Sequence, residues 1–349
     1  MKSAIRTVLI IILLLVAAGG GGAWYIWNGM QPVEPAGPAI TFTIEKGMGS
    51  AEIADLLEQN GIIRKSLFFK GYLKWTKEGS SFKAGTYIAK PGDSYDELIA
   101  RLNAGDVVKE ETVVFTIPEG YTAEQIAKKL AEAWNQDAAT FLEIMDTGAG
   151  LKGIDILGIP QDKNLRHRLE GYLFPETYEL AKDSTPQEVV EALLDQFQKK
   201  LDTIPNWQQK LETRGLSLHE LLTVASLVER EVVVDSERPL VAGVIYNRLK
   251  KEQKLEIDAT VQYLLNKQKE RLLYKDLEVD SPYNTYKNIG LPPGPISNPG
   301  LESIQAALEP EASEYYFYVT KKDGTQGHLF AKTYKEHLAN IEKSKQESK

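Results

Sequence analysis

The chain has 349 residues, a formal net charge of −8 at pH 7 and no cysteine. This length is sufficient for two globular domains with buried cores, and the lack of cysteine excludes disulfides, thiolate metal sites, a cysteine nucleophile and a lipidated N-terminal cysteine. The acidic balance, with no Lys/Arg block before the C-terminal tail, argues against nucleic-acid binding, because phosphate recognition needs clustered positive charge.

The first 30 residues are predicted to form a short cytoplasmic stub and a transmembrane anchor. No charged residue lies between Arg6 and Glu34, and about 20 apolar residues are enough to cross a bilayer. The two basic residues before the apolar run favour a cytoplasmic N-terminus, and the aromatic residues of AWYIW fit an interfacial belt. A cleaved signal peptide is the alternative, because small residues fill positions 17–22. We therefore expect a single-pass protein of the cytoplasmic membrane whose later domains are extracytoplasmic.

Residues 31–39 are a proline-rich linker, and three similar units follow it. Each unit reads as a short strand, a glycine turn and an amphipathic helix, with the glycines at Gly47, Gly92 and Gly120. Apolar residues come six, seven and ten positions after each glycine: Ile53, Ala54 and Leu57; Leu98, Ile99 and Leu102; Ile126, Ala127 and Leu130.

The first and third units resemble the openings of LysM modules, which are small βααβ domains that bind glycans containing N-acetylglucosamine. The resemblance implies a LysM-like module over residues 40–111. Any small α+β unit can begin in this way, so glycan contact and a purely structural role both remain open. Residues 112–343 are predicted to form a larger, mostly helical α+β domain, and residues 344–349 a solvated polar tail.

The stretch LLTVASLVEREVVVDSERP predicts a helix that carries an acid among apolar positions. Ser217 opens this helix, and Glu220 completes a capping box. At about 100° per residue, Glu229 lies off the polar stripe on one side, and Glu231 lies off it on the other. A carboxyl group in such a place requires either a charged partner or a chemical role.

Five segments together resemble the YceG-like (MltG) family of endolytic murein transglycosylases. They occur in the family's order over Glu170 to Ile341 and read EGYLFPETY, ASLVEREV with SERPLVAGVIYNRLKK, LEIDATVQY, YNTYKNIGLPPGPISNPG and GHLFAKTYKEHLANI. The resemblance implies a membrane-anchored enzyme that cleaves nascent peptidoglycan between N-acetylmuramic acid and N-acetylglucosamine. Its products carry 1,6-anhydromuramoyl ends, and the cleavage terminates strand elongation. One departure from the family pattern is the VVV run at 232–234, at the edge of the implied groove.

The resemblance places the catalytic glutamate at Glu229. One carboxyl group suffices for a lytic transglycosylase, because the substrate's own C6 hydroxyl is the nucleophile and the same group can give and then take a proton. Burial would keep this group protonated near neutral pH. The alternative for Glu229 is an ion pair with Arg230, Arg238 or Arg248. Glu231 is expected to support the site.

Seven further residues are candidates for substrate contact, because their side chains suit sugar hydroxyls, acetamides and peptide carboxylates: Asn247, Arg248, Asp258, Thr260, Asn284, Thr285 and Tyr286. Asp258 alternatively caps the helix that begins ATVQYLL. The histidines show no metal-ligand spacing, so we expect no metal and no cofactor. The expected partners are peptidoglycan strands and, through the family's role, penicillin-binding peptidoglycan synthases.

Two other functions remain open at this stage. A non-enzymatic scaffold would bind the wall and tolerate loss of Glu229. A muramidase that uses water would need a second carboxylate across the groove, such as Asp258.

Overall fold

The computed structural model describes residues 19–22, 24–33, 38–90, 92–108, 111–152, 158–265, 269 and 271–347, and it divides into two compact units, Met1–Glu110 and Glu111–Lys349. Most of the predicted anchor (1–18 and 23) lies outside the described residues, as do positions 34–37 of the linker. Residues 19–22 and 24–30 are helical. Among the described residues, no helix has the length and apolar character that crossing a membrane requires.

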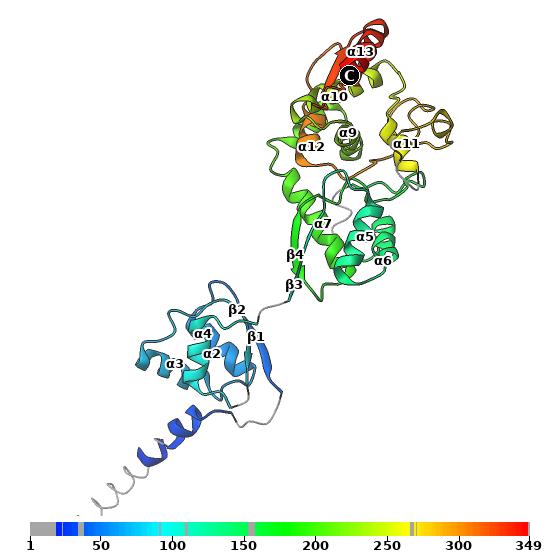
Figure 1. Ribbon diagram of the computed structural model, residues 1–349. Coiled ribbons are helices and arrows are strands. Elements are labelled where there is room, and N and C mark those ends of the chain that lie inside the picture. The colour runs from blue at the N-terminus through cyan, green and yellow to red at the C-terminus, as the bar shows by residue number, and fades with distance from the viewer. Residues whose placement is uncertain are drawn as a thin grey trace, which may run out of the picture. The chain divides into compact units, whose positions relative to one another are not determined.

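The first unit pairs two antiparallel strands and packs helices against them (Figure 1). Its elements are β1 (Ile40–Ile44), α2 (Ser50–Gln59), α3 (Ser66–Thr76), β2 (Gly85–Ala89) and α4 (Tyr95–Ala104). Phe42 and Tyr87 face each other in the register and are buried with Phe69 of α3, whereas Thr41 points to the outer face of the sheet. The order strand, helix, helix, strand is the one that the LysM resemblance implies, with α4 added, but the likeness to a LysM module stays a prediction.

The predicted internal repeat has a physical basis in both units. Gly47, Gly92 and Gly120 have φ angles of 95°, 93° and 73°, a region in which side chains other than glycine are strained. All nine apolar residues that follow them at six, seven and ten positions are buried, on α2, α4 and α5 (Ala123–Trp134). The shared register therefore places one face of each helix in a core.

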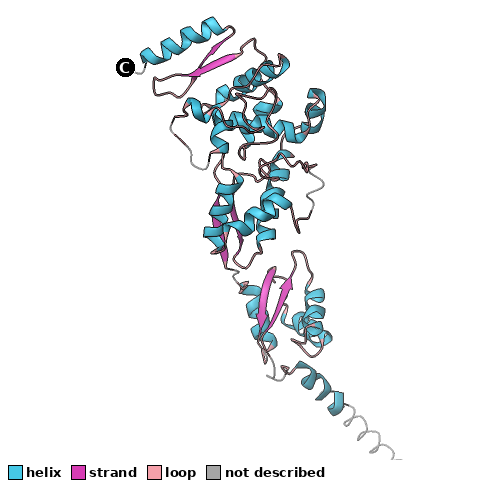
Figure 2. Cartoon of the chain, turned by 90° about the vertical axis from the view of Figure 1, so that its right-hand side faces the viewer, coloured by secondary structure: helices cyan, strands magenta, loops and turns pink. Residues whose placement is uncertain are grey.

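The second unit is mostly helical with two short antiparallel strand pairs, in agreement with the predicted α+β class (Figures 1 and 2). The pair β3 (Thr112–Thr116) and β4 (Thr177–Ala181) lies with helices α5, α6 (Ala138–Thr147) and α7 (Pro186–Leu201). The pair β5 (Phe317–Thr320) and β6 (His328–Ala331) packs on α13 (Tyr334–Glu347). Between these parts lie α8 (Trp207–Arg214), α9 (Leu218–Glu231), η2 (Asp235–Glu237), α10 (Arg238–Lys250), α11 (Asp258–Leu264), η3 (Tyr274–Asp276) and α12 (Leu301–Leu308).

Helix α9 lies at the centre of this unit. Every residue from Leu221 to Val228 is buried, because α10, α11 and α12 all pack against it. Its C-terminal turn, with Glu229 and Glu231, is therefore where the buried helix meets the surface of the unit.

The predicted polar tail needs correction. Helix α13 continues through Glu347, so positions 344–347 are helical and not a free tail. Ser344 is buried, and its hydroxyl donates a hydrogen bond to the Thr320 carbonyl at 2.7 Å. This contact ties the end of the chain to β5.

Candidate active site

The capping box predicted at the start of α9 is present. Ser217 Oγ accepts a hydrogen bond from the Glu220 amide at 3.2 Å, and Glu220 Oε2 accepts one from the Ser217 amide at 2.8 Å. These bonds satisfy donors that a helix start otherwise leaves unpaired. They fix where α9 begins and so the rotation at which its two terminal glutamates emerge.

Glu229 is held in an ion pair. Its side chain is only 7% exposed, and its Oε2 accepts hydrogen bonds from Arg238 Nη1 at 3.2 Å and from the Gly300 amide at 3.0 Å. Arg238 is equally enclosed and also contacts Ser303 and Asp235. Of the alternatives that the sequence left open, the pair with Arg238 is therefore formed. Among the described residues, nothing donates to Glu229 Oε1.

A carboxyl group that the sequence analysis missed lies beside this pair. Burial raises the pKa of Glu119, in the loop between β3 and α5, and the negative charge of Glu229 adds to the effect. A Cβ atom at Gly300 would lie 2.0 Å from Glu119 Oε1, so the carboxyl group of Glu119 packs directly against this glycine. The only sequence signal was that Glu119 precedes the turn glycine Gly120.

Glu231 lines an open cavity of about 620 Å³ on the other side of α9. Burial raises its pKa to about 7, and the negative charge of Asp258 acts in the same direction. Tyr318 of β5 donates a hydrogen bond to Glu231 Oε2 at 2.9 Å and acts in the opposite direction. Glu231 is therefore a carboxyl group that is partly protonated at neutral pH and can be reached from solvent.

A second carboxyl group, that of Asp258, lines the same cavity. Its Oδ1 accepts a hydrogen bond from Tyr286 Oη at 2.5 Å, and Tyr286 also lines the cavity. Asp258 is the first residue of α11 and makes no side-chain capping bond, so the prediction that it caps this helix is wrong. Its side chain instead turns toward Tyr286. Of the three carboxyl groups that line the cavity, those of Glu231 and Asp258 are each bonded to a tyrosine, and that of Glu256 is paired with Arg248 at 3.4 Å.

Arg248 forms part of the cavity wall, and its Nε and Nη1 groups already donate to groups of the protein. Its guanidinium donates to the carbonyls of Tyr316 at 2.6 Å and Leu255 at 2.8 Å. It also lies over the Phe317 ring, 5.1 Å from the centroid. Arg248 therefore joins the end of α10 to β5, the strand that carries the tyrosine bonded to Glu231.

The other four predicted contact residues make bonds inside the protein. Asn247 donates to the carbonyls of Ser313 and Tyr315, and Asn284 to those of Leu277 and Val279. The hydroxyls of Thr260 and Thr285 lie 3.0 Å apart and join α11 to the YNTY loop. Asn284, Thr260 and Thr285 are fully buried, and Asn247 is partly exposed. These contacts shape the loops that carry Asp258 and Tyr286.

A buried hub joins two of the sequence motifs behind the site. Glu170, from EGYLFPETY, accepts from the Ala123 amide at 2.9 Å, Tyr263 Oη at 3.1 Å and Asn298 Nδ2 at 2.8 Å. Asn298, from GPISNPG, accepts from the amides of Gly171 and Leu173, both at 2.9 Å. Complete burial raises the pKa of Glu170 to about 7. This hub holds the loop that presents the Gly300 amide to Glu229.

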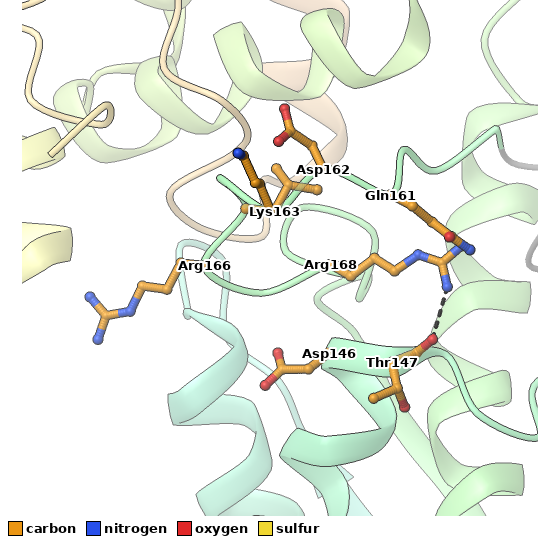
Figure 3. Close-up of a pocket in the computed structure, with 8 residues that line it drawn as sticks. Asp146, Thr147, Gln161, Asp162, Lys163, Arg166 and Arg168 are labelled. Carbon is orange, nitrogen blue, oxygen red and sulfur yellow. Dashed lines mark hydrogen bonds between the residues drawn. The ribbon is translucent and has the colours of Figure 1, made fainter.

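A second cavity of about 460 Å³ lies beside the end of α6 (Figure 3). It is lined by charged side chains that do not converge: Arg166 points away from Arg168, which donates to the Thr147 carbonyl at 2.9 Å. Arg166 is paired with Glu124 at 2.8 Å. Because its two arginines are engaged by other groups and its charged side chains do not converge, this cavity offers no arrangement comparable to that around Glu231.

Comparisons with known proteins show which family the chain is similar to. The sequence profile of the YceG-like family matches residues 42–343. The endolytic murein transglycosylase of Bacillus subtilis (strain 168) is 35% identical over 322 residues, which cover 90% of this chain and 87% of the relative. The endolytic murein transglycosylase of Streptococcus pneumoniae serotype 2 (strain D39 / NCTC 7466) is 31% identical over 339 residues, 91% of this chain and 60% of the longer relative.

A solved structure is also similar. The crystal structure of the YceG-like protein lmo1499 from Listeria monocytogenes superposes with a TM-score of 0.59 at 34% sequence identity. The match covers 86% of this chain and 98% of the listerial chain.

Proposed function

The chain belongs to the YceG-like family, and we propose that it is an endolytic murein transglycosylase that uses Glu231 as its general acid and base. The observation that carries this assignment is a carboxyl group with a pKa of about 7 in a cavity of about 620 Å³. A catalytic acid works best when its pKa lies near the working pH.

The reaction needs only this one carboxyl group. Glu231 Oε2 accepts the hydrogen bond from Tyr318, so the acidic proton of Glu231 is carried by its other oxygen, Oε1. This proton passes to the glycosidic oxygen as the bond from C1 of N-acetylmuramic acid to N-acetylglucosamine breaks. The C6 hydroxyl of the same muramoyl ring then bonds to C1 and returns its proton to Glu231. No water is consumed, and the product ends in a 1,6-anhydro ring.

Glu229, the residue that the family resemblance indicated, suits this role less well. Its Oε2 is engaged by Arg238 and by the Gly300 amide. It also lies about 200° around α9 from Glu231 and does not line the cavity. We assign Glu229 to holding the Gly300 loop in place.

A muramidase that uses water is the second candidate, and a specific observation favours it. Asp258 lines the same cavity as Glu231, and its negative charge raises the pKa of Glu231. Two carboxyl groups across a sugar are what ordinary glycoside hydrolysis requires. The bond from Tyr286 to Asp258 is equally compatible with a group that stabilises positive charge on the sugar ring.

We also place the enzyme at the cytoplasmic membrane, with both folded units facing the cell wall. The apolar run before Glu34 supports this location, because its length and its leading basic residues fit an inserted segment. From there the enzyme would meet glycan strands as they are made, next to penicillin-binding synthases. The first unit would contact the glycan if its LysM-like character extends to binding.

The test is mass spectrometry of the muropeptides that the full chain, in detergent micelles, releases from purified sacculi. We expect anhydromuramoyl products from the wild type and none from Glu231→Gln. Products heavier by one water would establish the muramidase. Retained glycan binding without any product from the wild type would establish the scaffold.

A further inference from the structure

Helix α3 of the first unit presents an apolar strip to solvent. Leu67 is 73% exposed and Trp75 is 78% exposed, and they lie about two helical turns apart with exposed Gly71 between them. The opposite side of α3 contributes Phe69 and Leu73 to the core. Large apolar side chains that are exposed together mark a surface that another phase or molecule covers. We call Leu67, Gly71, Lys74 and Trp75 the α3 face.

The α3 face lies beside the helix that ends the N-terminal apolar run. Phe68 of α3 meets Tyr25 edge to face, with ring centroids 5.6 Å apart. A Cβ atom at Gly29 would lie 2.1 Å from the Phe68 ring, so the two helices approach closely. The same N-terminal helix leaves a further group of apolar residues between 50% and 62% exposed: Trp24, Tyr25, Ile26 and Trp27.

Positive charge accompanies this apolar surface. The segment Ser66–Thr76 contains no Asp or Glu, and Lys70, Lys74 and Lys77 flank its exposed side. Lys70 is paired with Asp55 at 2.6 Å, whereas Lys74 and Lys77 are exposed. Aromatic and aliphatic residues edged by lysines are the composition of helices that lie in the interface of an anionic bilayer.

We propose that the α3 face rests on the membrane surface, with Leu67 and Trp75 in the headgroup region and Lys74 and Lys77 on anionic lipid phosphates. The inference rests on the proposed membrane attachment and adds a second, peripheral contact to it. The packing of α3 against residues 24–30 favours lipid over other occupants. With the apolar run inserted in the bilayer, the helix that ends this run lies at the membrane surface, and α3 lies beside that helix. The face would then be closed to glycan and to a second copy of the chain.

The chain lacks cysteine, so a single introduced thiol can carry a fluorescent label that bromine on lipid acyl chains quenches. Gly71→Cys reports on the α3 face with Leu67 and Trp75 intact, because a Cβ atom there meets nothing within 4 Å. Thr41→Cys, on the outer face of β1, is the matched control. Leu14→Cys reports on insertion of the apolar run. The full chain is reconstituted in vesicles of phosphatidylglycerol and phosphatidylcholine.

We expect the label at position 71 to be quenched at least about threefold more than the label at position 41. Replacing both Leu67 and Trp75 by serine in the Gly71→Cys chain should remove the difference. Reversing the charge of Lys74 and Lys77 should reduce it in anionic vesicles.

Three outcomes would overturn the proposal. Strong quenching at position 14 with equal, weak quenching at positions 41 and 71 would leave membrane attachment intact and exclude the α3 contact. Absence of quenching at all three positions would exclude both the membrane attachment and the α3 contact. A label at position 71 that responds to chitooligosaccharide, or to a second labelled copy, but not to lipid would assign the face to glycan or to a dimer.

Discussion

Tyr318 and Glu231 are 87 residues apart in the sequence and 2.9 Å apart in the structure, where the tyrosine hydroxyl donates to the carboxyl group. The bond joins the end of the central helix α9 to strand β5, against which α13 packs. The C-terminal part of the chain thereby completes the cavity around the proposed acid.

Glu231→Gln should abolish activity while leaving the fold intact. The amide cannot supply a proton, so we expect a loss of about 100-fold to 10,000-fold in kcat, as is usual for removal of a general acid. Its oxygen can still accept the bond from Tyr318, so the melting temperature should not fall. The measurement is turnover of purified glycan strands beside thermal unfolding of both proteins. Full activity in this variant would remove Glu231 from the mechanism.

Tyr318→Phe should shift the alkaline limb of the pH–activity profile to a higher pH. The hydroxyl stabilises the ionised form of Glu231 and so lowers its pKa, and its loss raises that pKa. An acid is active below its pKa, so activity falls as the pH rises through about 7 in the wild type and at a higher pH in the variant. The measurement is kcat/KM from pH 5 to pH 9. An unchanged alkaline limb would show that Glu231 is not the titrating group.

Asp258→Asn should shift the alkaline limb of the pH–activity profile to a lower pH. The charge of Asp258 raises the pKa of Glu231, so its removal makes the carboxyl group lose its proton at a lower pH. The opposite signs expected for Tyr318→Phe and Asp258→Asn separate a real electrostatic effect from general damage. Anhydro products from Asp258→Asn would also show that Asp258 is not needed as a second carboxylate, whereas complete loss of product would favour the muramidase.

Glu229→Gln should lower stability more than chemistry. Both members of the pair with Arg238 are over 90% buried, and removing one charge from such a pair costs about 3 to 5 kcal/mol. Arg238→Met should cost a similar amount, and the double variant less than the sum. Urea unfolding of the three variants gives the coupling free energy. A stable but inactive Glu229→Gln would instead return the catalytic role to Glu229.

The sequence predicted the local features of the site correctly. The capping box at Ser217 and Glu220 and the glycine turns at Gly47, Gly92 and Gly120 depend on neighbours within a few residues, so spacing alone reveals them. Helical geometry also showed that Glu229 and Glu231 leave α9 on different sides.

Spacing could not show which of these sides faces a cavity. The partners that decide this come from distant segments: Arg238 and Gly300 enclose Glu229, and Tyr318 and Asp258 surround Glu231. For the same reason Asn284, Thr260 and Thr285 looked suited to sugar, although they bond within buried loops. Polar side chains in motif-rich loops serve the loop as often as the ligand, and only tertiary contacts distinguish the two.

The raised pKa of Glu231 also predicts how stability depends on pH. The group ionises near pH 4.3 in an unfolded chain and at about 7 in the folded protein. Between these values the native state binds more protons than the unfolded state, so the free energy of unfolding falls as the pH rises and levels off above 7. The contribution is at most about 4 kcal/mol. Glu231→Gln removes it, while the similarly buried Glu170 remains in both proteins and cancels in the comparison.

Hydrogen exchange of the most protected α9 amides, corrected for intrinsic rates, measures this free energy for the second unit. From pH 5 to pH 8 we expect the wild type to lose more stability than Glu231→Gln, which would therefore be the more stable protein at pH 8. Equal losses would mean that Glu231 ionises alike in the folded and unfolded states. A group of that kind would be charged at neutral pH and unable to act as the acid, so the same experiment tests the proposed mechanism without substrate.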